Sequence, residues 1–150
     1  MKKLLLAFTT LSMLLLPSCD KDDDEDENEE PSVTVESLAG NYKLTGVWVK
    51  LNSLPSEVDV TNDRLEDCEK DDIYNLKSDF TYAYLDAGTK CSPPGDDSGT
   101  WALPGNDVIH IDGAPFNVVK WDGTELHISQ SGTDPTTGQS GTVRIVFVRQ

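Results

Sequence analysis

Basic residues are scarce in this sequence. It has 12 Lys and Arg against 27 Asp and Glu, and its formal net charge is −15 over 150 residues. Proteins that bind nucleic acids obtain much of their affinity from Lys and Arg side chains that neutralise phosphates. The scarcity therefore argues against a nucleic-acid partner, and the length allows one domain of ordinary size.

Motifs that mark catalytic or cofactor sites are also missing. The sequence has no nucleophile elbow, phosphate-binding loop or His-Glu metal motif. His110 and His127 lie inside expected strands, without the spacing of metal ligands. The acidic pairs Asp71-Asp72 and Asp96-Asp97 offer the oxygen ligands that Ca²⁺ prefers, but they lack EF-hand spacing and are interpreted as solvated loop acids. We therefore expect no enzyme activity, no cofactor and no metal.

Only one long apolar run occurs, and it lies at the beginning of the chain. Lys2 and Lys3 precede residues 4–16, which are apolar except for two Thr and one Ser. A positive start followed by a short apolar stretch is the plan of a secretory signal peptide. The stretch is shorter than the roughly 20 apolar residues of a transmembrane helix, and no other stretch approaches that length.

The apolar run ends in Leu16-Pro17-Ser18-Cys19. A small residue followed by Cys at this point resembles the lipobox of bacterial lipoproteins. The resemblance implies cleavage after residue 18, lipidation of Cys19 and attachment of the mature chain to a membrane by its acyl chains. The alternative is an ordinary signal peptide with a chance Cys.

Residues 20–30 contain nine acidic residues, one Lys and no apolar side chain. Like charges at this density repel one another, so the tract is expected to be an extended tether. Its Lys21-Asp22-Asp23 also resembles the acidic export signal of surface lipoproteins in some Gram-negative phyla. That resemblance implies an outer-membrane lipoprotein facing the cell exterior, and a plain solvated linker is the alternative. We expect three parts: a signal peptide at 1–18, a lipidated, disordered linker at 19–37 and a globular domain at 38–150.

The globular part lacks any long window with a helical period. Short segments of alternating apolar residues follow one another, separated by turn residues such as Asp112-Gly113 and Asp122-Gly123. Because a flat meander would leave two unpaired edges, we predict an all-β fold, an eight-stranded antiparallel up-and-down barrel. The expected strands are 41–51, 72–77, 80–86, 99–103, 107–112, 116–121, 125–131 and 142–149.

The order of several short motifs resembles the lipocalin-like domains of bacterial surface lipoproteins. Leu38-Ala39-Gly40-Asn41-Tyr42-Lys43-Leu44 is similar to the Leu-x-Gly-x-Trp-x-Leu opening of these barrels, with Tyr42 in place of Trp. Gly99-Thr100-Trp101-Ala102-Leu103 and the closing Val146-Phe147-Val148-Arg149 follow in the family's order. The resemblance implies a barrel from Leu38 to Arg149, and it places Arg149 where it can stack on Tyr42.

Cys68 and Cys91 remain once Cys19 carries lipid. Outside the cytoplasm disulfides persist, and the two cysteines flank an expected hairpin that would bring them together. A thiol-based metal or catalytic site is the alternative, but no Cys-x-x-Cys occurs. The sequence therefore favours a structural disulfide between Cys68 and Cys91.

The aromatic residues are the best candidates for ligand contact. Trp48, Tyr82, Tyr84 and Trp121 offer flat apolar faces with polar tips that can line the mouth or lumen of a barrel. Alternatively, they only fill the interior, because an eight-stranded barrel is barely wide enough to hold a small molecule. Trp101 is the strongest candidate for the core.

Residues 52–69 form the longest stretch without a strand pattern. Thr61 or Asn62 is a candidate N-cap, so a short helical turn is expected there. A long loop near a barrel mouth can act as a lid. The favoured hypothesis is a surface-anchored lipoprotein that binds a small apolar or amphipathic ligand. The alternative is a non-enzymatic module that docks another surface protein or a glycan.

Overall fold

The computed structural model describes residues 31–133 and 138–150. The predictions for the signal peptide, for Cys19 and for residues 20–30 lie outside the described residues. Within the described ranges, no helix is long and apolar enough to cross a membrane. The strands in chain order are β1 (Gly40–Leu51), β2 (Val58–Asp59), β3 (Ile73–Leu76), β4 (Thr81–Leu85), β5 (Asp97–Gly105), β6 (Val108–Ile111), β7 (Ala114–Trp121), β8 (Glu125–Thr133) and β9 (Ser140–Arg149). The helices are α1 (Val35–Leu38), α2 (Thr61–Arg64) and the 3₁₀-helix η1 (Asp67–Glu69).

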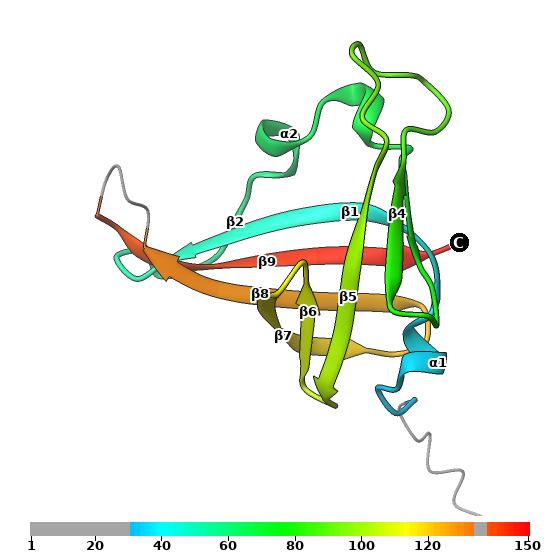
Figure 1. Cartoon of the computed structure of the whole chain (residues 1–150). Coiled ribbons are helices and arrows are strands. Elements are labelled where there is room, and N and C mark those ends of the chain that lie inside the picture. The colour runs from blue at the N-terminus through cyan, green and yellow to red at the C-terminus, as the bar shows by residue number, and fades with distance from the viewer. Residues whose placement is uncertain (1–30, 134–137) are drawn as a thin grey trace, which may run out of the picture.

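The predicted eight-stranded antiparallel barrel is confirmed. From β3 to β9 each strand pairs with the next one along the chain, and β1 pairs with both β3 and β9. The pairing of β1 with β9 runs from Tyr42 opposite Arg149 to Leu51 opposite Gly141, and it closes the wall. In Figure 1, β1, β8 and β9 run together across one side, and β4 and β5 cross in front of them.

Side-chain alternation in β9 identifies the inner face of the barrel. Ile145 and Phe147 pack in the hydrophobic core, while Arg144 on the opposite face is paired with Glu57. The most buried core residues come from strands all round the barrel: Tyr42, Trp101, Ile109, Trp121, Leu126 and Ile128. Trp101 is 2% exposed, which confirms its predicted place in the core.

Helix α1 covers one end of the barrel, close to the C-terminus (Figure 1). Its capping box joins the hydroxyls and backbone N–H groups of Thr34 and Ser37 in both directions. Leu38 at its end is fully buried, and Val33 and Val35 pack against the core. The packed part of the chain therefore begins before residue 38, the expected boundary of the domain.

The segment 52–69 holds β2, α2 and η1. The predicted helical turn is confirmed as α2, but its N-cap is Val60 instead of Thr61 or Asn62. Thr61 has another role: its Oγ1 accepts a hydrogen bond from the backbone N–H of Val47 (2.8 Å) and donates one to Asp59 (2.6 Å). Together with the pairing of β2 and β1, these contacts hold the first half of the segment against β1.

Candidate functional site: a cavity in the barrel

An apolar cavity of about 90 Å³ lies inside the barrel. Strands β1, β3, β4, β6, β8 and β9 supply its lining, because the inward positions of these strands converge there. Three tyrosines contribute, Tyr42, Tyr74 and Tyr82. The other lining residues are Leu76, Ile109, Ile111, Leu126, Ile128 and Phe147.

The three tyrosine hydroxyls differ in their hydrogen bonds. The Tyr42 hydroxyl donates to the carbonyl oxygen of Leu38 (2.7 Å) and accepts from Arg149 (3.1 Å). The Tyr82 hydroxyl donates to the Asp112 carboxylate (2.6 Å), and this bond raises the pKa of the Tyr82 phenol to about 12. The Tyr74 hydroxyl has no hydrogen-bond partner within residues 31–133 and 138–150. The Tyr74 hydroxyl can therefore hydrogen-bond to a ligand, whereas the Tyr42 and Tyr82 hydroxyls already hydrogen-bond to the protein.

Arg149 organises the end of the barrel under α1. Its guanidinium lies over the rings of Trp121 and Tyr42, 4.9 and 5.5 Å from their centroids. The same group donates to the carbonyl oxygens of Ser37 (2.5 Å) and Ala39 (2.8 Å). The expected stacking of Arg149 on Tyr42 is confirmed, and the contact with Trp121 is a further finding. This cluster closes the barrel end and joins α1 to β1, β7 and β9.

Carboxylates lie beside the cavity at Tyr74. The Tyr74 ring packs on the Tyr84 ring with centroids 4.7 Å apart, and the Tyr84 hydroxyl donates to Asp72. Asp72 and Asp86 are each 1% exposed, and an oxygen of one carboxylate lies within 4.8 Å of an oxygen of the other. The interpretation of Asp72 as a solvated loop acid is therefore wrong, because the fold buries its carboxylate against Tyr84.

The segment 86–96 folds around these carboxylates. Asp72 accepts a hydrogen bond from the N–H of Ala87 (2.8 Å), and Asp86 accepts from the N–H groups of Cys91 (3.2 Å) and Gly95 (3.3 Å). Backbone donors of one loop thus satisfy acids that the barrel buries.

The predicted disulfide between Cys68 and Cys91 is confirmed. It joins η1 to the segment 86–96. The Cys91 sulfur lies near Asp72 and Asp86, but it is bonded to Cys68 and is not a thiolate. The group therefore offers only two carboxylates, and both accept hydrogen bonds from the protein.

The four predicted ligand-contact residues lie in different places. Tyr82 lines the cavity, Tyr84 packs behind Tyr74, and Trp121 is a core residue under Arg149. Trp48 lies on the outer face of β1, where the Arg144 guanidinium is 5.3 Å from its ring centroid. The expected position of Trp48 at the lumen is therefore wrong. A β-bulge between Leu44 and Gly46 shifts the alternation of β1, so Trp48 does not share the face of Tyr42 and Leu44.

Sequence reasoning did not single out Tyr74, Asp86 or the inward role of Tyr42. The signal for Tyr74 was its position two residues before Leu76 in an expected strand, which places both side chains on one face. Asp86 carried no comparable signal, because its burial depends on the path of the segment that follows it.

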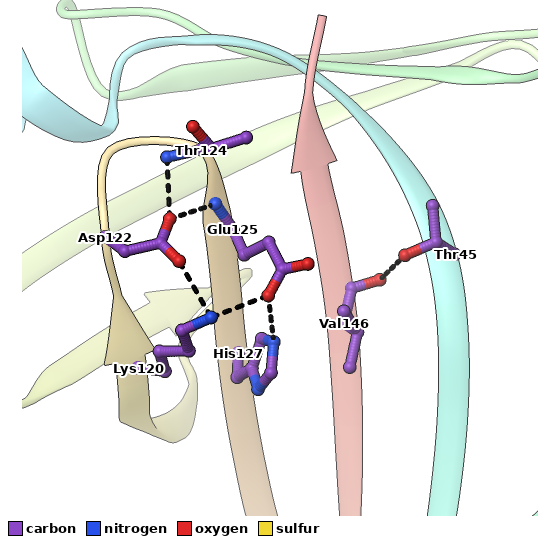
Figure 2. A network of polar contacts seen from close by, with 7 residues as sticks. All are labelled: Thr45, Lys120, Asp122, Thr124, Glu125, His127 and Val146. Carbon is purple, nitrogen blue, oxygen red and sulfur yellow. Dashed lines mark hydrogen bonds and ion pairs between the residues drawn. The ribbon is translucent and has the colours of Figure 1, made fainter.

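A polar network lies outside the barrel at the turn between β7 and β8 (Figure 2). Lys120 lies 2.7 Å from both Asp122 and Glu125, and these ion pairs raise the pKa of the lysine. Asp122 also accepts hydrogen bonds from the N–H groups of Thr124 and Glu125, and these bonds lower its pKa. His127 Nε2 lies 3.3 Å from Glu125. The charges in this network satisfy one another and fix the turn, so we assign it a structural role.

Comparison with known proteins identifies the family of the barrel domain. The family described as "Lipocalin-like domain" matches residues 38–133, which is more than half of the chain. No curated protein and no solved structure matches the chain. The family match covers β1 to β8, and β9 completes the closed wall. The chain belongs to the lipocalin-like domain family.

Proposed function

We propose that this domain binds a small apolar ligand in the cavity of its barrel. The observation that carries the proposal is the cavity of about 90 Å³ lined by six apolar side chains and three tyrosines. Transfer of apolar ligand surface from water into such a cavity is favourable. The family match supports the same proposal by fold analogy.

The size of the cavity limits the ligand. An engineered apolar cavity of about 150 Å³ is large enough to bind benzene, and the cavity of this barrel is smaller, at about 90 Å³. We infer that it holds a short alkyl chain, or one end of a longer amphipathic molecule.

Binding can be tested with a series of linear alcohols from butanol to octanol. The measurement is NMR of the isolated domain beginning at residue 31, in which the methyl signals of Ile109 and Ile128 report on the cavity. We expect saturable shifts of these methyl signals and a rise in melting temperature with ligand concentration.

Two variants separate the cavity from the outer surface. Ile111→Phe extends a half-buried lining residue into the cavity and is expected to weaken alcohol binding at least tenfold. Val119→Phe adds the same ring at a position that is 55% exposed and is expected to leave binding unchanged. Saturable binding that survives Ile111→Phe, or no binding of any alcohol, would contradict the proposal.

We also propose that Cys19 carries acyl chains and anchors the protein to the outer membrane of a Gram-negative bacterium, facing the exterior. The support is the apolar run ending in Leu16-Pro17-Ser18-Cys19 and the acidic tract at 20–30. Mass spectrometry of the mature protein should find an acylated Cys19 at its N-terminus, and Cys19→Ala should release the protein from membranes. An unmodified N-terminus at another residue would contradict the anchor.

A further inference from the structure

Of the three tyrosines that line the cavity, Tyr74 is the one whose hydroxyl forms no hydrogen bond with residues 31–133 or 138–150. The hydroxyls of Tyr42 and Tyr82 are both engaged in hydrogen bonds with the protein. That of Tyr74 is without a hydrogen bond in the described part of the chain, although its ring is held between Tyr84 and Phe147. Tyr74 is therefore the cavity-lining tyrosine whose hydroxyl is not engaged by residues 31–133 or 138–150.

The surroundings of Tyr74 are negative. Burial raises the pKa of the Tyr74 phenol to about 12, and the Glu69 and Asp72 carboxylates act in the same direction. Asp86 adds a second buried carboxylate beside Asp72. Across residues 31–133 and 138–150, neither Asp72 nor Asp86 forms an ion pair with Lys, Arg or His. The hydrogen bonds that these two acids accept come from neutral N–H and O–H groups.

We propose that the ligand of this cavity is a small apolar amine, whose alkyl part fills the cavity and whose ammonium group lies at Tyr74. This inference rests on the proposed function, and it adds the chemical class of the ligand. The ammonium donates a hydrogen bond to the Tyr74 hydroxyl.

Charge then decides between ligands of the same shape. An ammonium group at Tyr74 is attracted by the carboxylates of Glu69, Asp72 and Asp86, because charges interact strongly where little water separates them. A carboxylate at the same place is repelled by all three. An alcohol can use the Tyr74 hydroxyl but gains nothing from the acids. The expected order of affinity is therefore amine, then alcohol, then carboxylate.

The test compares n-pentylamine, n-pentanol and pentanoate, three probes with the same alkyl chain. At neutral pH and low salt we expect pentylamine to bind at least tenfold more tightly than pentanol, and pentanoate to bind most weakly. The advantage of the amine should shrink as salt is added, because the attraction is screened. If all three bind with similar affinity, or pentanoate binds most tightly, the inference fails while the proposed function stands. If none binds, the proposed function itself fails.

Variants assign the selectivity to named groups. Asp72→Asn removes one buried charge and should reduce the amine-to-alcohol ratio several-fold. Glu69→Gln, in η1, tests the same effect in case the Asp72 variant does not fold. Tyr74→Phe should weaken pentylamine and pentanol alike. Glu36→Gln removes an exposed acid from α1, beneath the closed end, and should leave the ratio unchanged. An unchanged ratio in both Asp72→Asn and Glu69→Gln would overturn the inference.

Discussion

The Arg149 guanidinium lies 4.9 Å from the centroid of the Trp121 ring, between β9 and β7. The same group donates hydrogen bonds to two carbonyl oxygens and to the Tyr42 hydroxyl. A half-buried charged group with this many partners leaves several of them unsatisfied when it is removed. Closure of this barrel end therefore depends on one side chain near the end of the last strand.

Arg149→Ala should lower the free energy of unfolding by about 2–4 kcal/mol, since it removes hydrogen bonds and two ring contacts. Urea denaturation followed by tryptophan fluorescence measures the change. The matched control is Arg144→Ala, which loses an ion pair with Glu57 and a contact with Trp48 on the outer face. That pair is expected to contribute less than about 1 kcal/mol. Equal losses in the two variants would contradict the role given to Arg149.

Removal of the disulfide should destabilise the domain. The double variant Cys68→Ser/Cys91→Ser opens a loop with a sequence separation of 23 residues, and chain entropy predicts a loss of roughly 3 kcal/mol. Denaturation of the wild type with and without reductant gives the same comparison without substitution. A stability that neither the variant nor the reductant changes would show that the crosslink does not constrain the unfolded chain.

Gly99 leaves room for the bond between Tyr82 and Asp112. A Cβ atom at Gly99 would lie 2.2 Å from Asp112 Oδ1 and 2.7 Å from Cε1 of the Tyr82 ring. Gly99→Ala should therefore displace both groups and cost about 1–3 kcal/mol. Gly132→Ala is the control, because a Cβ there meets nothing within 4 Å. If Gly99→Ala is as mild as Gly132→Ala in thermal unfolding, the close packing around Tyr82 is wrong.

The raised pKa values of the tyrosine phenols predict that the stability of the domain falls at alkaline pH. The phenols of Tyr74 and Tyr82 have a pKa of about 12 in the folded protein, against an ordinary value of 10.0. Because the folded-state pKa is raised, the stabilising contribution is complete below pH 10 and is lost as the pH rises from about 10 to about 12. Burial raises the pKa values of Tyr42 and Tyr84 as well, so near-ultraviolet absorbance of phenolate should show all four tyrosines titrating above the ordinary value. Tyr74→Phe and Tyr82→Phe should each remove one late titration, and ordinary titration of both phenols would contradict the assignment.

Much of the fold could be predicted because the strands alternate and end at turn residues. The hairpin turns at Asp112-Gly113 and Asp122-Gly123 lie between β6 and β7 and between β7 and β8, as their sequence predicts. The two-residue strand β2 has no room for alternation, and the single turn of α1 has no helical period. The sequence therefore carries only weak signals for both.

The candidate site was less predictable for two physical reasons. A one-residue bulge between Leu44 and Gly46 moved Trp48 to the outer face, and a second shift between Val118 and Lys120 places Trp121 on the inner face. Such shifts leave no clear mark in a single sequence. Burial of Asp72 and Asp86 depends on the path of the segment 86–96 between β4 and β5, which has no strand or helix pattern.

The central claim is that the barrel takes a ligand into its cavity. Intermolecular NOEs between the alkyl protons of bound pentylamine and the methyl groups of Ile109 and Ile128 test it most directly. The account predicts such NOEs in the wild-type domain and in Val119→Phe, and their loss in Ile111→Phe. Pentylamine that binds without contact to these methyl groups, or shows NOEs only to residues of the outer face, would contradict it.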